Sequence, residues 1–193
     1  AMDKSRLSFR DIDAIASTAG PGLMGGLLVG VVAAKTLSSA LKKPFIAVNH
    51  LEGHALSIRL ETDIDFPYLL LLVSGGHTEF TMINEILYTK TSHAIDIFQA
   101  RQRKNKTVKI VVAGGVAANK SLRKSLEKIE KERDCEFLFP SIKYCTDNGA
   151  MIALAGIERF ERKLFNKLNF KPKPRWPLDK KAIFMKGKRA VGH

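Results

Sequence analysis

The strongest constraint on the fold is a pattern that occurs twice, an apolar run followed within one residue by two glycines. Residues 68–73 form a continuous apolar run before Gly75-Gly76, and residues 108–112, which are apolar except for Lys109, precede Gly114-Gly115. A continuous apolar run of this length is typical of a strand buried on both faces of a parallel sheet. Segments with helical spacing lie between such runs, so the sequence predicts an α/β fold with ligand sites at the strand ends.

The remaining elements follow from spacing and from helix start and stop signals. We expect further strands over residues 13–19, 45–48 and 137–140, and helices over residues 25–41, 50–60, 85–98, 119–133 and 146–160. Lys42, Lys43 and Pro44 are stop signals for the first of these helices. Asn49 and Thr146 are expected to cap the helices that follow them.

The chain is basic, with 32 Lys and Arg against 19 Asp and Glu and a net charge of +13. Contact with nucleic acid and a generally basic composition both explain this balance. The tail from Asn169 holds eight Lys or Arg and one Asp, interleaved with three prolines and Trp176. The prolines favour an extended surface segment, which either binds nucleic acid or is simply a solvated tail.

Cys135 and Cys145 are the only cysteines, and their spacing fits neither a zinc site nor a redox pair. Both are expected to be packing residues in a reducing compartment. The longest unbroken apolar runs are too short to span a bilayer, and no secretory segment opens the chain. A cytoplasmic location is therefore the expectation.

His50 and His54 are four residues apart, so on a helix both imidazoles can reach one cation. Zinc, iron and similar ions accept such a pair, although two surface histidines can share this spacing by chance. The motif is not that of a metalloprotease, which requires a glutamate next to the first histidine. Glu52 lies two residues after His50 and points about 200° away around the helix.

The first glycine turn consists of Ser74, Gly75, Gly76, His77 and Thr78. Two glycines let the backbone turn sharply and present N–H groups to a phosphate, and the hydroxyl groups add donors. A simple hairpin turn is the alternative for so short a motif.

The second glycine turn, Gly114-Gly115, is followed by Asn119 and a basic amphipathic helix. Its glycines allow a flat ligand to approach the backbone, and the helix start attracts negative charge. Two such turns after two buried strands predict a nucleotide site.

Asp147 stands just before the last strong helix. It could complement the helix dipole. It could equally complete a set of two imidazoles and one carboxylate with His50 and His54, which leaves metal positions open for phosphate or substrate oxygens.

Taken together, five motifs closely resemble the TsaD family of tRNA N6-adenosine threonylcarbamoyltransferases. They are Ala19-Gly-Pro-Gly-Leu23, Asn49-His-Leu-Glu-Gly-His-Ala55, Ser74-Gly-Gly-His-Thr78, Ala113-Gly-Gly-Val-Ala-Ala-Asn119 and Cys145-Thr-Asp-Asn148. The resemblance covers residues 10–178 with one interruption. It implies an incomplete actin-like (ASKHA) two-lobed ATPase fold. Residues 3–66 would be the remainder of the first lobe, residues 67–168 the second lobe and residues 169–193 the basic tail.

The resemblance also implies an activity, which is transfer of threonylcarbamoyl from its adenylate to N6 of the tRNA adenosine 3′ of the anticodon. It implies one divalent metal (iron or zinc, with magnesium an option) and ATP, ADP or the adenylate. By motif position, the metal ligands would be His50, His54 and Asp147. Ser74 to Thr78 would contact phosphate or the carbamoyl donor, and Gly114, Gly115 and Asn119 would face the nucleotide. The implied partners are tRNA and TsaB-like and TsaE-like proteins. No residue is assigned as a catalytic acid, base or nucleophile.

The chain departs from the family pattern in two places. Members open with a strand that contains glycine and Asp, and this sequence has no such strand before Asp3. Members also carry a long block between the two glycine turns. Here the chain passes from Phe80 to Val111 without that block. Either the sequence joins two segments of a complete protein, or the gene product is itself shortened.

Two alternatives to the enzyme follow from these departures. A non-catalytic actin-like module that binds a partner or tRNA would account for the missing block. Retention of both histidines and Asp147 favours the enzyme instead. A basic nucleic-acid-binding domain without nucleotide would leave both glycine turns unexplained.

Overall fold

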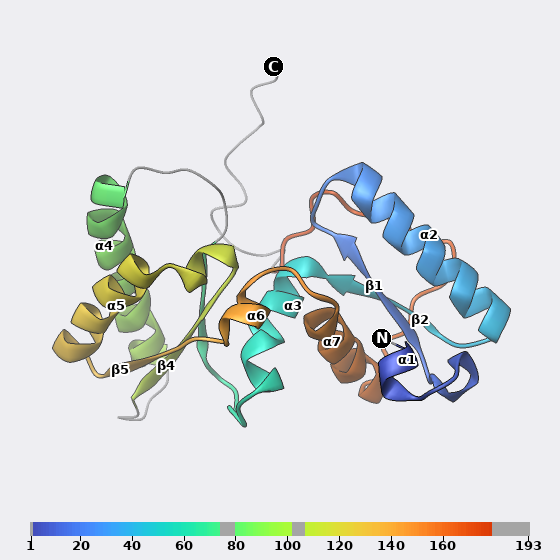
Figure 1. Ribbon diagram of the computed structural model, residues 1–193. Coiled ribbons are helices and arrows are strands. Elements are labelled where there is room, and N and C mark those ends of the chain that lie inside the picture. The colour runs from blue at the N-terminus through green and yellow to red at the C-terminus, as the bar shows by residue number, and fades with distance from the viewer. Residues whose placement is uncertain (1, 74–79, 102–106, 179–193) are drawn as a thin grey trace, which may run out of the picture. The chain divides into compact units, whose positions relative to one another are not determined.

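The computed structural model describes residues 2–73, 80–101 and 107–178, and Figure 1 labels the elements within them. The chain divides into two compact units. The first consists of Ala1–Glu52 with Gly156–His193, and the second of Gly53–Ala155.

The second unit contains a parallel sheet whose strand order is β3-β4-β5. Its strands are β3 (Leu69–Leu72), β4 (Val108–Ala113) and β5 (Cys135–Leu138), and helices α4 (Phe80–Arg101) and α5 (Lys120–Glu132) connect them. Parallel neighbours require such crossover helices, so the strand–helix alternation read from the sequence takes this form. Strands β3 and β4 carry the two apolar runs that predict the α/β class, and the class is confirmed.

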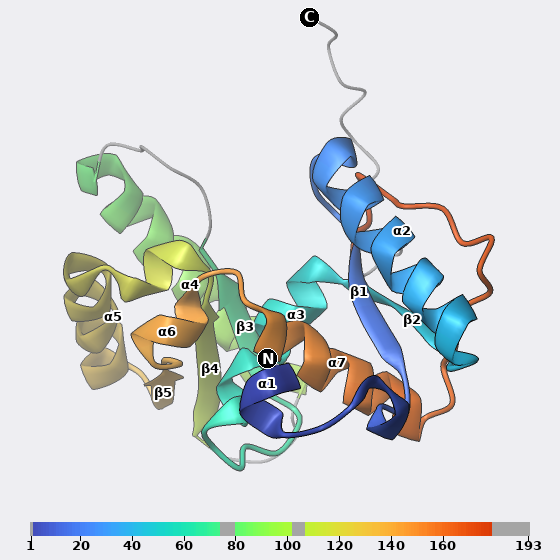
Figure 2. The ribbon, with the colours of Figure 1, turned by 45° about the vertical axis from the view of Figure 1, so that its right-hand side comes forward.

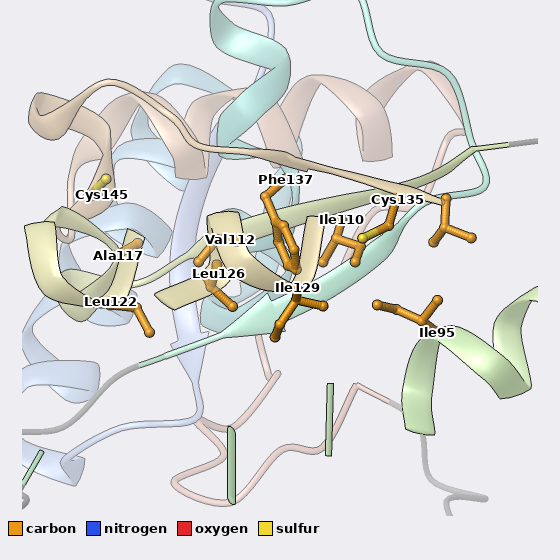
Figure 3. Packing of buried hydrophobic residues seen from close by; sticks show 11 residues of the cluster. Ile95, Ile110, Val112, Ala117, Leu122, Leu126, Ile129, Cys135, Phe137 and Cys145 are labelled. Atoms are coloured by element: carbon orange, nitrogen blue, oxygen red, sulfur yellow. The ribbon is translucent and has the colours of Figure 1, made fainter. Parts of the chain in front are cut away.

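One face of this sheet packs against α4 and α5. Alternate residues of β4, Ile110 and Val112, meet Leu126 and Ile129 of α5, and all four are fully or almost fully buried. Figure 3 shows these side chains directed into one cluster, together with Ile95 of α4. The cluster exists because α5 places apolar residues three and four positions apart on one stripe while its other face is charged.

The opposite face of the sheet is covered by a short segment that follows helix α3 (His50–Leu56). This segment is the 3-10 helix η2 (Ser57–Leu60), and its Ile58 packs with Ile64 against Val111 of β4. Apart from the exposed Lys109, strand β4 is thus buried on both faces, as a central strand of a parallel sheet should be.

The first unit is built around two parallel strands, β1 (Ile15–Gly20) and β2 (Phe45–Asn49), joined by helix α2 (Met24–Leu41). Val31 and Ala34 of α2 pack on Ala19 and Phe45 of these strands. The short helix α1 (Met2–Ser5) and a 3-10 turn over Phe9–Asp11 precede β1. Figure 2, a view from another direction, shows that α2 runs along the two strands.

Helix α2 is long and apolar enough to cross a membrane on length and composition alone. Buried core helices and signal sequences meet the same criterion, so the finding is weak evidence for a span. No unbroken apolar run in this helix is long enough to span a bilayer, whereas its mean hydropathy also includes its Gly, Ser and Thr residues.

The chain after helix α7 (Gly149–Glu161) returns to the first unit as an extended segment. Asn166 pairs with Phe45, and the backbone N–H of Lys173 donates to the carbonyl of Ala19 at 2.7 Å. The amide of Asn49 donates to the carbonyl of Trp176 at 2.9 Å. The start of the basic tail is therefore extended, as expected, and is attached to the strands; residues 179–193 lie outside the described part.

Three sequence-predicted details are wrong. Thr146 does not cap the last long helix, because it ends the short helix α6 (Ile142–Cys145) and Asn148 accepts from the N–H of Met151 instead. Strand β5 begins at Cys135, two residues before the predicted strand. Helix α3 ends at Leu56 and continues only as the 3-10 helix η2.

Candidate metal centre

Helix α3 carries both histidines of the predicted metal set. It begins at His50 because Asn49 caps it, with the Asn49 Oδ1 accepting from the N–H of Leu51 at 2.9 Å. The predicted cap is confirmed. His50 and His54 are therefore one turn apart on one helix, with His54 only 3% exposed and His50 half-buried.

Asp147 lies beside His54 although 93 residues separate them in the sequence. Its Oδ1 is 3.1 Å from Nε2 of His54, and both residues belong to the second unit. The carboxylate remains open, since the Asp147 side chain keeps 74% of its accessible surface. Asp147 thus meets the buried histidine from an exposed turn.

These three residues form one candidate metal site within the part of the chain that is described. One ligand atom each from His50, His54 and Asp147 lies within 4.8 Å of the others, and the continuous helix α3 fixes the two histidines relative to each other. Two imidazole nitrogens and one carboxylate oxygen suit zinc or iron and leave positions open for other ligands. The donor set therefore fits a divalent metal.

The glutamate inside the histidine motif points away from this cluster. Glu52 forms a two-point ion pair with Arg159 of α7, with Nη2–Oε2 and Nε–Oε1 distances of 2.6 and 3.0 Å. A carboxylate held by a guanidinium in this way is not available to activate a metal-bound water. This supports the exclusion of a metalloprotease, and the ion pair itself has no signal in the sequence.

The second glycine turn lies at the carboxyl end of β4. Gly114 has φ +95°, and a Cβ there would lie 2.5 Å from the carbonyl oxygen of Val73. A Cβ on Gly115 would meet no atom within 4 Å, so that side of the turn is open. Asn119 caps α5, with its Oδ1 accepting from the N–H groups of Ser121 and Leu122. The turn therefore combines an open backbone with a helix start, as an anion site requires.

The first glycine turn, Ser74 to Thr78 with Gly75, Gly76 and His77, lies outside the described residues. The strand before it, β3, pairs with β4 over its whole length. Because β3 and β4 are parallel neighbours, their carboxyl ends lie at the same edge of one sheet.

A carboxylate that the sequence analysis missed holds the chain upstream of Asp147. Glu61 accepts from the Ser141 hydroxyl at 2.7 Å and from the Ser141 N–H at 2.8 Å. These two hydrogen bonds, with Lys143 nearby, lower the pKa of Glu61 from its ordinary value of 4.5. Ser141 directly precedes α6, so Glu61 fixes the start of the segment that ends at Asp147.

Replacing Glu61 with Gln should lower the midpoint of thermal unfolding at pH 7. A carboxyl whose folded pKa is depressed stabilises the fold above its unfolded pKa, and this stabilisation is lost as the pH falls through the folded pKa. The difference between wild type and Glu61→Gln should therefore shrink below about pH 4. Thermal melts of both proteins from pH 3 to 7 measure this difference. The control is Glu127→Gln, which replaces an exposed carboxylate of α5. A difference that is independent of pH would contradict the assignment.

Both cysteines are buried and unpaired, as the sequence predicts. Burial raises the pKa of the Cys135 thiol to about 11 and also raises the pKa of Cys145. Cys145 is fully buried and its thiol donates to the carbonyl of Pro140 at 3.4 Å, so it packs in the interior as expected.

Comparison with known proteins identifies the family of this chain. The family model described as TsaD, tRNA N6-adenosine threonylcarbamoyltransferase, matches residues 1–103 and 87–154. The chain belongs to the TsaD family. A relative from Pelagibacter ubique carrying that enzyme's name is 36% identical, over 97% of this chain and 79% of the relative. Relatives of the same name from Rickettsia rickettsii and Rhodospirillum rubrum are 35% and 32% identical, over 92% and 94% of this chain and 80% and 78% of theirs.

The alignments also locate the interruption seen in the sequence. The alignment to the Pelagibacter protein runs over 284 positions, which exceeds the 193 residues of this chain. These relatives therefore contain a long stretch with no counterpart here. The two matched ranges of the family model overlap at residues 87–103, within helix α4. The missing block thus belongs between β3 and β4, where α4 is the element that the described residues form.

Proposed function

We propose that this chain acts in threonylcarbamoyl transfer to tRNA, with the adenosine 3′ of the anticodon as acceptor and threonylcarbamoyl-adenylate as donor. One observation carries the proposal: a chain of the TsaD family retains both histidines and the carboxylate of its metal motif, with ligand atoms within 4.8 Å. In the reaction, the N6 amine forms a bond to the donor's carbonyl carbon, the bond from that carbon to phosphate oxygen breaks, AMP leaves, and the amine releases one proton to solvent.

His50, His54 and Asp147 are the residues that would hold the metal, which is iron or zinc by donor type, with magnesium a further option. When bound, the metal would polarise and orient carbonyl and phosphate oxygens of the donor. The chain's own contribution is rigid placement. Burial of His54 and the Asn49 cap on α3 fix the imidazoles, while Asp147 stays exposed toward incoming ligands.

The nucleotide is assigned to the glycine turns. Gly114 and Gly115 would let the nucleotide approach the backbone, and the start of α5 after Asn119 would favour its negative charge. Ser74 to Thr78 are proposed to contact phosphate or the carbamoyl donor from the end of the neighbouring strand.

The tRNA is proposed to bind through basic surface, and the extended segment after α7 is one candidate. From Arg162 to Leu178 it contains six Lys or Arg and no acidic residue. Such cations hold a nucleic acid through its phosphates without reading sequence. TsaB-like and TsaE-like proteins are the proposed protein partners, and the cytoplasm is the proposed location.

A transfer assay tests this function. The chain, a tRNA transcript, the adenylate and the partner proteins are incubated, and the digested tRNA is analysed for an adenosine carrying the threonylcarbamoyl mass. We expect product with wild type and at least about a hundredfold less with Asp147→Ala, because removing a metal ligand removes placement of the donor. Equal product from both would contradict the proposed site. Metal and nucleotide binding without product would leave a non-catalytic module.

A further inference from the structure

Arg123 of α5 joins the second glycine turn to the segment that leads to Asp147. Its Nε donates to the carbonyl of Ala117, inside the turn η3 (Gly115–Ala118), at 2.8 Å. Its Nη2 lies 3.9 Å from Sγ of Cys145, the last residue of α6. The guanidinium also stacks on Phe139, with 4.5 Å between Cζ and the ring centroid.

The segment from Cys145 to Asn148, which Arg123 contacts, is fixed by burial and by hydrogen bonds. Cys145 is fully buried, and its thiol donates to the carbonyl of Pro140 at 3.4 Å. Asn148 donates to the carbonyl of Thr146 and accepts from the N–H of Met151, which fixes the turn into α7. Arg123 contacts Cys145, and only Thr146 separates Cys145 from Asp147 in the sequence.

The backbone turn that carries Asp147 helps to set the position of its carboxylate. The Asp147 side chain keeps 74% of its surface accessible, so packing of the carboxylate itself contributes little. The turn from Cys145 to Asn148 therefore contributes to the 3.1 Å distance between Asp147 and His54. A group that holds Cys145 also sets where the Asp147 carboxylate lies.

We propose that Arg123 is a positioning residue that couples the nucleotide turn to the metal ligand Asp147. This inference rests on the proposed function, because it assumes that nucleotide meets the turn and metal meets the carboxylate. A nucleotide that orders Gly115–Ala118 would order Arg123 through Ala117, and Arg123 would then fix the segment that carries Asp147. Coupling of this kind requires each ligand to tighten the binding of the other by the same factor.

Lysine cannot replace arginine in this role. The guanidinium presents donors in a rigid fork, so Nε and Nη2 contact two groups at once while the plane stacks on Phe139. A lysine keeps the charge near the site but offers a single nitrogen. Arg123→Lys therefore separates positioning from the electrostatic effect of a cation.

The test measures the binding of Co²⁺ with and without ATP, from the visible absorption of the bound ion. Wild type should bind Co²⁺ more tightly with ATP present. Arg123→Lys should weaken Co²⁺ binding about tenfold, in the range seen for residues that orient metal ligands, and should reduce the tightening by ATP. Lys124→Met, which removes a neighbouring exposed cation from the same helix, is the matched control and should behave as wild type.

A second variant keeps the proposal testable if Arg123→Lys folds poorly. Cys145→Ala removes the contact to the Asp147 segment and leaves the bond from Arg123 to Ala117, so it should lower Co²⁺ affinity and spare ATP affinity measured without metal. If Arg123→Lys and Cys145→Ala, checked for folding by circular dichroism, match wild type in affinity and coupling, the proposal is overturned. Wild type that binds neither Co²⁺ nor ATP would overturn the proposed function as well.

Discussion

The His54→Ala variant is expected to bind a divalent metal at least about a hundredfold more weakly than wild type. Loss of an orienting residue alone costs about ten- to a hundredfold in metal affinity, and His54 would be a direct ligand. The residue is 3% exposed and its Nε2 lies 3.1 Å from Asp147, so no other donor can easily take its place. Titration with Co²⁺, followed by absorption and by calorimetry, measures the change.

A second histidine provides the matched control for this experiment. His93 lies exposed on α4, away from the predicted ligands in sequence, and His93→Ala removes an imidazole without touching the set. It should leave the Co²⁺ affinity within about twofold of wild type, since weak surface sites do not contribute. Comparable losses in His54→Ala and His93→Ala would contradict the assignment of His54 as a specific metal ligand.

The Gly114→Ala variant should be destabilised by about 2–4 kcal/mol, the largest stability effect expected here. Gly114 has φ +95°, which an L side chain rarely adopts, and its new Cβ would lie 2.5 Å from the Val73 carbonyl oxygen. That oxygen belongs to the backbone and accepts from the N–H of Val116, so it cannot move without breaking a hydrogen bond. The unfolding midpoint should fall by roughly 10 °C, given the scale for domains of this size.

The Gly115→Ala variant is the control, because it makes the same glycine-to-alanine change at a position without backbone strain. A Cβ on Gly115 meets no atom within 4 Å, and its φ lies outside the positive range. Gly115→Ala should therefore change the free energy of unfolding by less than about 1 kcal/mol. If both alanine variants unfold at the same temperature, the turn does not have the geometry described.

The order of strands and helices could be read from the sequence because it depends on local pattern. Apolar runs gave β3 and β4, and the stripe of Leu122, Leu126 and Ile129 gave α5. The Asn49 cap also has a local cause, since its side chain bonds to the backbone two residues on. Thr146 resembles a cap in the sequence because the short helix α6 has no periodicity to reveal it.

The contacts that assemble the candidate site have no such local signal. Asp147 and His54 are 93 residues apart, and Glu52 and Arg159 are 107 residues apart. Their pairing depends on how α3, α6 and α7 pack, which is decided by tertiary burial and not by spacing. Arg123 was read only as part of a basic helix, because nothing in the sequence shows that it folds back onto Ala117.

Native mass spectrometry of the purified chain with one equivalent of Co²⁺ and excess ATP tests most directly whether the metal and nucleotide sites act together. We expect a complex of one chain, one metal and one nucleotide, because the histidine–aspartate set and the glycine turns serve one reaction. The His54→Ala variant should lose the metal and bind nucleotide more weakly. Nucleotide binding that is absent, or that is unchanged by loss of the metal, would show that the two sites do not form one reaction centre.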